Sequence, residues 1–148
     1  MVIKNRIFAL VFRAVGIVMS IAGIVASLFQ TGSFHAGTLL YYTLMSNIVV
    51  SAYFIITLVL TAKDVKGGGK EDSPSYFPKL SMVLAIDILL TMTVYWGMLV
   101  PATAVFGSDL EIFSFGNVVA HTITPLLMIA DCILLNKRGA LKPVHCVL

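Results

Sequence analysis

The segment 39–61, with the sequence LLYYTLMSNIVVSAYFIITLVLT, decides the fold class of this chain. It contains no charged residue, and a helix of about 20 mainly apolar residues is long enough to cross a hydrocarbon core of roughly 30 Å. Its β-branched residues do not indicate strands. A bilayer admits only helices and closed barrels, and the strands of barrels alternate in polarity. The segment is therefore predicted to be a transmembrane helix.

Three further segments have the same length and apolar character, and they are 7–28, 80–100 and 112–135. The loop 62–79 between the second and third segments contains three consecutive glycines, two prolines and several charges, which is typical of a flexible polar connection. The 148 residues are thus predicted to form a single membrane domain, an all-α bundle of four transmembrane helices, followed by a cytoplasmic tail at 136–148.

The composition excludes several classes of protein. Apolar residues make up 59% of the chain and charged residues 11%, against about 45–50% and about 25% in soluble domains. Disorder, a nucleic-acid-binding domain and an ordinary soluble enzyme are excluded, whereas an enzyme inside a membrane is not. The expected partners are membrane lipids and no nucleic acid. Association into a homo-oligomer is left open.

The basic residues predict the orientation in a cell membrane. All ten lie before the first span, between the second and third, or after the fourth, apart from Arg13 in the first turns of the first span. By the positive-inside bias, this multipass protein has a cytoplasmic N-terminus and a cytoplasmic C-terminus. Four aromatic residues near the outer helix ends are interpreted as interface anchors: Tyr41, Tyr42, Tyr95 and Trp96. The alternative, a first span removed as a signal peptide after 25–27, remains open.

Small and polar residues predict which helix faces point inward. Gly16, Ser20, Gly23 and Ser27 form a seam on the first span along which another helix can approach closely. The other spans carry polar residues at three-four spacing: Thr43, Ser46 and Asn47; Asp87 and Thr91; Asn117, His121, Thr124 and Asp131. Pro125, four residues after His121, frees a backbone carbonyl and is expected to kink the fourth span or to be tolerated.

The outer of two predicted polar layers contains Thr43 and His121. At about 1.5 Å per residue, the positions of Thr43 and His121 in their spans place both side chains in the outer half of the membrane. A histidine beside a hydroxyl can act as a base that activates a nucleophile, and Ser46 is a rival nucleophile on the same face. Helix packing, transport and ligand binding are the alternatives for this layer.

The inner layer contains Arg13, Asp87 and Asp131 as a charge network. Arg13 is the only cation at a matching depth, and a paired carboxylate is far cheaper to bury than a lone one. We expect the network to anchor the first, third and fourth spans, with a proton relay as the alternative.

No metal site or cofactor is expected. His35, His121 and His145 belong to an outer loop, a helix and the tail, so they cannot converge on one ion. Cys132 and Cys146 both lie on the reducing side, which disfavours a disulfide. The chain contains no phosphate-binding loop and no dinucleotide-binding glycine motif.

Four segments together resemble a known family. They are YTLMSN at 42–47, TMTVYW at 91–96, HTITP at 121–125 and IAD at 129–131. As an ordered set they resemble the bacterial six-pass Pr-six-Pr membrane proteins, a family distantly similar to the animal androgen-induced membrane proteins. The resemblance covers most of the chain. Because the family has six spans and this chain has four, the chain is expected to be a truncated form.

The resemblance implies an activity. The animal relatives are multipass hydrolases of fatty acid esters of hydroxy fatty acids, with an intramembrane threonine nucleophile and a histidine. Thr43 and His121 match these two residues by position, which makes a lipid ester hydrolase the preferred function. Ser46, Asn47 or Asn117 would orient the base or stabilise the oxyanion. The alternative functions are a non-enzymatic lipid-binding or scaffolding protein and a proton-coupled transporter that uses Asp87, Asp131 and His121.

Overall fold

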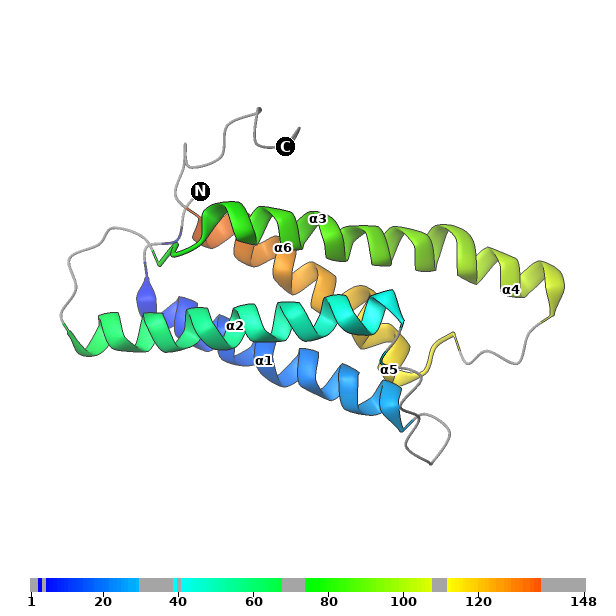
Figure 1. Ribbon diagram of the computed structural model, residues 1–148, viewed down its shortest axis with the longest axis horizontal. Coiled ribbons are helices and arrows are strands. Elements are labelled where there is room, and N and C mark those ends of the chain that lie inside the picture. The colour runs from blue at the N-terminus through cyan, green and yellow to red at the C-terminus, as the bar shows by residue number, and fades with distance from the viewer. Residues whose placement is uncertain are drawn as a thin grey trace.

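The fold is a bundle of four long helical spans (Figure 1). The computed structural model describes residues 3, 5–29, 39, 41–67, 74–107 and 112–136, and its regular elements there are all helices. The first two spans are α1 (Arg6–Leu28) and α2 (Tyr42–Lys66). The third joins α3 (Pro78–Val94), η2 (Tyr95–Leu99) and α4 (Val100–Phe106), and the fourth joins α5 (Phe115–Val118), η3 (Val119–Ile123) and α6 (Thr124–Leu135). The prediction of an all-α four-helix bundle is confirmed.

Each of the four spans is long and apolar enough to cross a membrane. Large apolar side chains also cover the outer surface of the bundle, as Val11, Ile55, Leu90 and Ile133 illustrate with exposed fractions between 43% and 64%. Monomeric soluble proteins rarely expose large contiguous apolar patches. Length, composition and surface therefore fit a multipass integral membrane protein.

Two spans are longer than the sequence predicted. α2 continues to Lys66 instead of ending at 61, and the third span continues to Phe106 instead of 100. The end of α2 was predicted too early because Lys63 and Lys66 are polar enough to belong to a loop. Cations are nevertheless favourable in the last turn of a helix.

The start of α1 is well defined, since the side chain of Asn5 accepts hydrogen bonds from the backbone N–H groups of Ile7 and Phe8.

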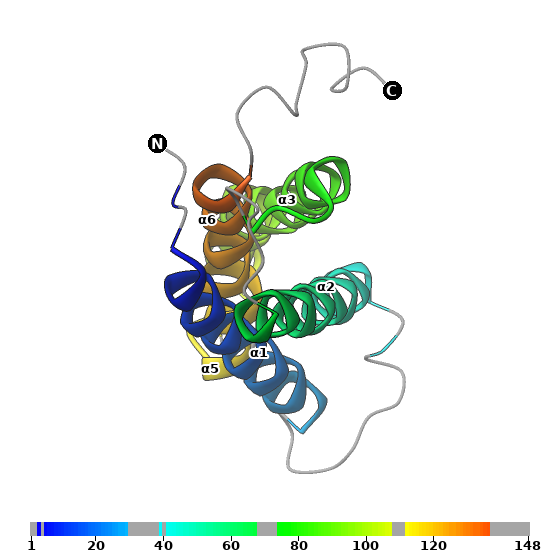
Figure 2. The ribbon, with the colours of Figure 1, turned by 90° about the vertical axis from the view of Figure 1, so that its left-hand side faces the viewer.

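The helices surround a common interior, as the end-on view in Figure 2 shows. We call the end where α1 begins and α6 ends the near end. The far end is where α1 ends and α2 begins. An apolar core that includes Val50, Phe54, Ile88 and Met128, each completely buried, fills the interior between the two ends.

The predicted seam of small residues on α1 is a close packing surface. A Cβ atom on Gly16 would lie 3.0 Å from the ring of Phe54, and one on Gly23 would lie 2.8 Å from Cγ1 of Val119. The hydroxyl of Ser51 on α2 donates to that of Ser20 at 2.8 Å. Any larger side chain would push α1 away from α2 and from the fourth span.

The two π-helical turns, η2 and η3, interrupt the third and fourth spans two residues before a proline. The N–H of Val100 bonds to the carbonyl of Tyr95, and that of Thr124 bonds to the carbonyl of Val119. Pro101 and Pro125 follow as the second residues of α4 and α6. Proline cannot donate to the carbonyl four residues earlier, and its ring crowds that carbonyl. A widened turn before each proline relieves this conflict, and such turns are frequent at functional sites.

Candidate functional site

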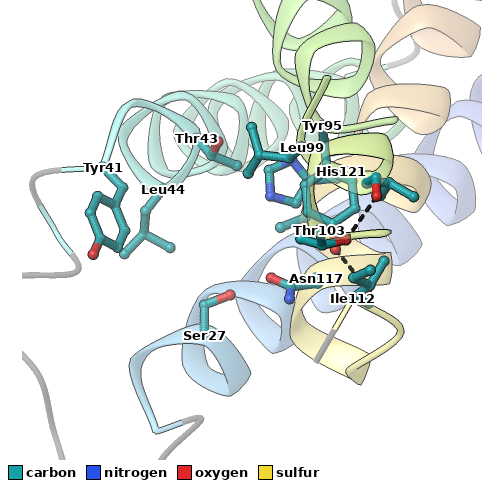
Figure 3. Close-up of a pocket in the computed structure, with 12 residues that line it drawn as sticks. Ser27, Tyr41, Thr43, Leu44, Tyr95, Leu99, Thr103, Ile112, Asn117 and His121 are labelled. Carbon is teal, nitrogen blue, oxygen red and sulfur yellow. Dashed lines mark hydrogen bonds between the residues drawn. The ribbon is translucent and has the colours of Figure 1, made fainter. Parts of the chain in front are cut away.

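A cavity at the far end brings the central residues of the predicted outer layer together. Its volume is about 440 Å³, and Thr43 from α2, Asn117 from α5 and His121 from η3 all line it. Most of the remaining wall is apolar and includes Leu44, Leu99 and Ile112. Figure 3 shows Thr43 and His121 on different helices, facing the same space. A mostly apolar pocket with a few polar groups is the usual form of a small-molecule site.

The imidazole of His121 is held in place by an aromatic ring. The ring of Tyr95 stacks on it with centroids 3.9 Å apart and planes 11° apart, and the Tyr95 hydroxyl donates to the carbonyl of Ile112 at 2.6 Å. The imidazole also bonds to the backbone of Thr91, whereas its Nδ1 atom is buried and has no partner among the described residues. Nδ1 is therefore the ring atom whose hydrogen-bonding capacity is unused among the described residues.

Asn47 fixes the backbone positions from which Thr43 and His121 project. Its side-chain amide donates to the carbonyl of Thr43 at 2.8 Å and to that of Ala120 at 3.2 Å. It thereby joins α2 to η3 one residue before His121. Asn47 is 1% exposed and does not line the cavity. These bonds reach the backbone and not the imidazole, so the role of Asn47 in orienting the base stays a prediction.

Thr43 and His121 are close in space without being bonded to each other. No hydrogen bond joins their side chains in the part of the chain that is described. Ser46, the rival nucleophile, is buried outside the cavity wall. Catalytic hydrogen bonds are often long in ligand-free enzymes and tighten when substrate binds.

Tyr95 was predicted to be an interface anchor, and this interpretation is wrong. Its side chain is 5% exposed, lines the cavity and packs against His121. Trp96 is only partly exposed, and its indole donates to the hydroxyl of Thr122 at 2.9 Å. The two π-helical turns therefore face each other across the site. The four-residue spacing from Thr91 to Tyr95 was the sequence signal for this inward direction.

The near end contains the predicted ion pair. Nε of Arg13 lies 3.1 Å from Oδ1 of Asp131, and the two side chains are 1% and 0% exposed. Arg13 also donates to the hydroxyl of Thr61 at 2.6 Å and to the carbonyl of Pro74 at 2.9 Å. The second oxygen of Asp131 accepts from Tyr53 at 2.8 Å. This near-end network joins α1, α2, α6 and the segment that precedes α3.

Asp87 does not belong to that network, so this part of the prediction is wrong. It accepts a hydrogen bond from the hydroxyl of Tyr42, at the opposite end of α2 from Thr61. The buried residues of α3 are Ser81, Leu84, Ala85, Ile88 and Thr91, and Asp87 lies beside this stripe and is partly exposed. The prediction for Asp87 used only its depth along the axis of α3, whereas the direction in which its side chain points from that helix determines its hydrogen-bond partner.

The apolar core separates the near-end network from the cavity. Val50, Phe54 and Met128 are fully buried and lie between the two polar regions. A proton path between His121 and Asp131 would have to cross this layer, so the arrangement gives no support to a transporter.

No group of three metal-ligating side chains occurs within the described ranges. His35, His145 and Cys146, which the sequence analysis considered, lie outside those residues. Comparison of the chain with models of protein families, with curated proteins and with solved structures found no match in any of the three.

Proposed function

We propose that this protein is an intramembrane hydrolase of lipid esters. One observation carries the proposal: Thr43 and His121, which are 78 positions apart in the sequence, line the same mostly apolar cavity. A hydroxyl needs a base to become a nucleophile, and the unpartnered Nδ1 atom of His121 is suited to accept its proton.

The proposed reaction has two halves. The Thr43 hydroxyl attacks the ester carbonyl and passes its proton to His121, which then protonates the departing alcohol. The acyl group is now bound to Thr43. A water molecule that has lost a proton to His121 attacks this second ester, and the acid leaves as the Thr43 hydroxyl is restored. Asn117 lines the same cavity, and we assign its amide the role of stabilising the oxyanion.

A non-enzymatic lipid-binding protein is the second candidate. The lack of a hydrogen bond between Thr43 and His121 within the described residues favours lipid binding. The ring of Tyr95 also favours it, because that ring already covers one face of the imidazole. In this case the cavity would hold a lipid and the two polar side chains would orient its headgroup.

Covalent labelling by a lipid-like fluorophosphonate distinguishes the two candidates. The full chain in lipid vesicles should be labelled at Thr43, and Thr43→Ala should remove the label. His121→Ala should slow labelling by about 10²–10⁴-fold, the usual contribution of a general base. Thr43→Ser should retain it, because serine keeps the hydroxyl.

Thr93→Ala is the matched control, since Thr93 is exposed on α3 and its hydroxyl donates to the carbonyl of Leu89 on the same helix. It should be labelled like the unmodified chain. Thermal unfolding in detergent must show that each variant is folded. Absence of labelling in the folded, unmodified chain, or labelling that persists in Thr43→Ala, would remove the hydrolase proposal and favour lipid binding.

A further inference from the structure

Thr43 and His121 also line a second, smaller cavity. Its volume is about 190 Å³, and it lies between α2 and α3. Thr43, Tyr95, Leu99 and His121 contribute to both cavities. The two side chains assigned to the chemistry therefore stand where two separate spaces meet.

The smaller cavity is a groove that faces the surroundings of the bundle. Its walls include Leu90 and Val94, whose side chains are 53% and 37% exposed, and Leu99 at the junction is 43% exposed. In a chain that crosses a membrane, side chains exposed at this position meet lipid. The groove is thus accessible from the hydrocarbon region of the bilayer.

A carboxyl group lies beside this groove. Tyr42 forms part of its wall and donates its hydroxyl to Asp87, which lies one helical turn before Leu90 on α3. A carboxylate at this position repels another anion, and the exposed wall that Leu90, Val94 and Leu99 form is apolar. The groove therefore suits an uncharged hydrocarbon chain.

We propose that the two cavities hold the two arms of one ester, and that Leu90 and Val94 determine which smaller arm is accepted. This inference rests on the proposed function, since an ester carbonyl at Thr43 places its acyl and alcohol parts on opposite sides. The uncharged smaller arm lies in the groove between α2 and α3. The larger arm lies in the 440 Å³ cavity, where Ser27, Thr103 and Asn117 also accommodate polar groups.

A dialkyl ether with arms of unequal length tests the inference without any catalysis. One version carries a photoreactive diazirine at the end of the shorter arm and the other at the end of the longer arm. After irradiation in vesicles containing the full chain, the labelled residues are mapped by mass spectrometry. The shorter arm should label the turn of α3 around Leu90 and Val94, and the longer arm should label residues near Val100 and Ile112.

Leu90→Trp should fill the groove and reduce shorter-arm labelling several-fold, while longer-arm labelling persists. Leu89→Trp is the matched control, because Leu89 is exposed on the same helix and does not line either cavity. Labelling of the same residues by both arms, labelling of neither cavity, or an unchanged result in Leu90→Trp would overturn the inference. The ether reports binding alone, so failure of the hydrolase proposal shows separately, in the fluorophosphonate experiment.

Discussion

The two polar regions of the bundle differ in how completely their hydrogen bonds are satisfied. At the near end, both oxygens of Asp131 and all three nitrogens of the Arg13 guanidinium have partners. At the far end, Oδ1 of Asn47, Nδ1 of His121 and Oγ1 of Thr124 are buried with no partner among the described residues. Buried polar groups are usually paired, and each exception requires an explanation. The difference fits a stabilising role for the near end, and at the far end it is in keeping with the proposal that the cavity receives another molecule.

The largest effect that this comparison predicts is the loss of stability when the ion pair is broken. Arg13→Ala leaves the carboxylate of Asp131 buried without its cation, which costs about 3–5 kcal/mol in comparable sites. Chemical unfolding in detergent micelles should show this decrease. The double substitution Arg13→Met with Asp131→Leu should recover much of it, because it removes both charges together.

Lys63→Ala is the control for that experiment, since Lys63 is exposed and close to the same end. His121→Ala and Thr43→Ala should change the unfolding free energy much less than Arg13→Ala. If either of them destabilised the bundle as strongly, the proposed division between an anchoring end and a receiving end would be wrong.

The contrast between the two ends also explains what the sequence could and could not predict. Transmembrane helices follow from long apolar runs, so all four were found. The pairing of Arg13 with Asp131 followed from depth, because only one cation lay at that level. Tyr53, Thr61 and the Pro74 carbonyl were missed, since the same residue types occur throughout apolar spans without charged partners.

The far end was harder to predict, because its geometry depends on two π-helical turns. Tyr95 was placed with the interface aromatics because it lies near the outer end of its span. Its four-residue spacing from Thr91 points inward, but nothing in the spacing shows that its ring covers His121. Both turns precede prolines, and Pro125 had been expected to free a backbone carbonyl and to kink the span or be tolerated, with no widened turn before it. Asp87 was misassigned because depth alone was used for it. It lies beside the buried stripe of α3 and accepts from Tyr42, at the far-end start of α2.

A smaller effect is expected where α1 touches the far end. Gly23→Ala places a methyl group against Val119, two residues before His121, and overpacking of this kind costs about 1–3 kcal/mol. Because the contact displaces η3, Thr43 should also be labelled more slowly by the fluorophosphonate. Parallel unfolding and labelling measurements on one preparation check both effects.

Gly97→Ala is the matched glycine control. A Cβ atom at this position in η2 would meet no atom within 4 Å in the described structure, so the change in stability should stay within about 0.5 kcal/mol. Equal destabilisation by both substitutions would mean that contact with Val119 does not account for the effect of Gly23→Ala, since alanine by itself favours a helix more than glycine does.

The smallest predicted effect concerns the segment that closes the near end. The Tyr76 ring lies 5.6 Å from the Arg13 guanidinium, and its hydroxyl donates to Asp64. Burial, and then the bond to Asp64, raise the pKa of Tyr76 above its ordinary value of 10.0. The folded chain therefore holds this proton more tightly than the unfolded chain does. The resulting stabilisation is complete below the unfolded pKa and is lost as the pH rises through the folded pKa.

Thermal unfolding of the unmodified chain and of Tyr76→Phe, compared from about pH 8 to about pH 11, tests this linkage around the ordinary tyrosine pKa. The other tyrosines are common to both proteins, so the difference between the two unfolding midpoints isolates Tyr76. That difference should be constant at the lower pH values and should shrink above about pH 10. A difference that stays constant over the whole range would show that the hydroxyl does not contribute to the near end through its bond to Asp64. The anchoring of the segment before α3 would then depend on the bond from Arg13 to the Pro74 carbonyl and on the bond from Ser75 to Asn136.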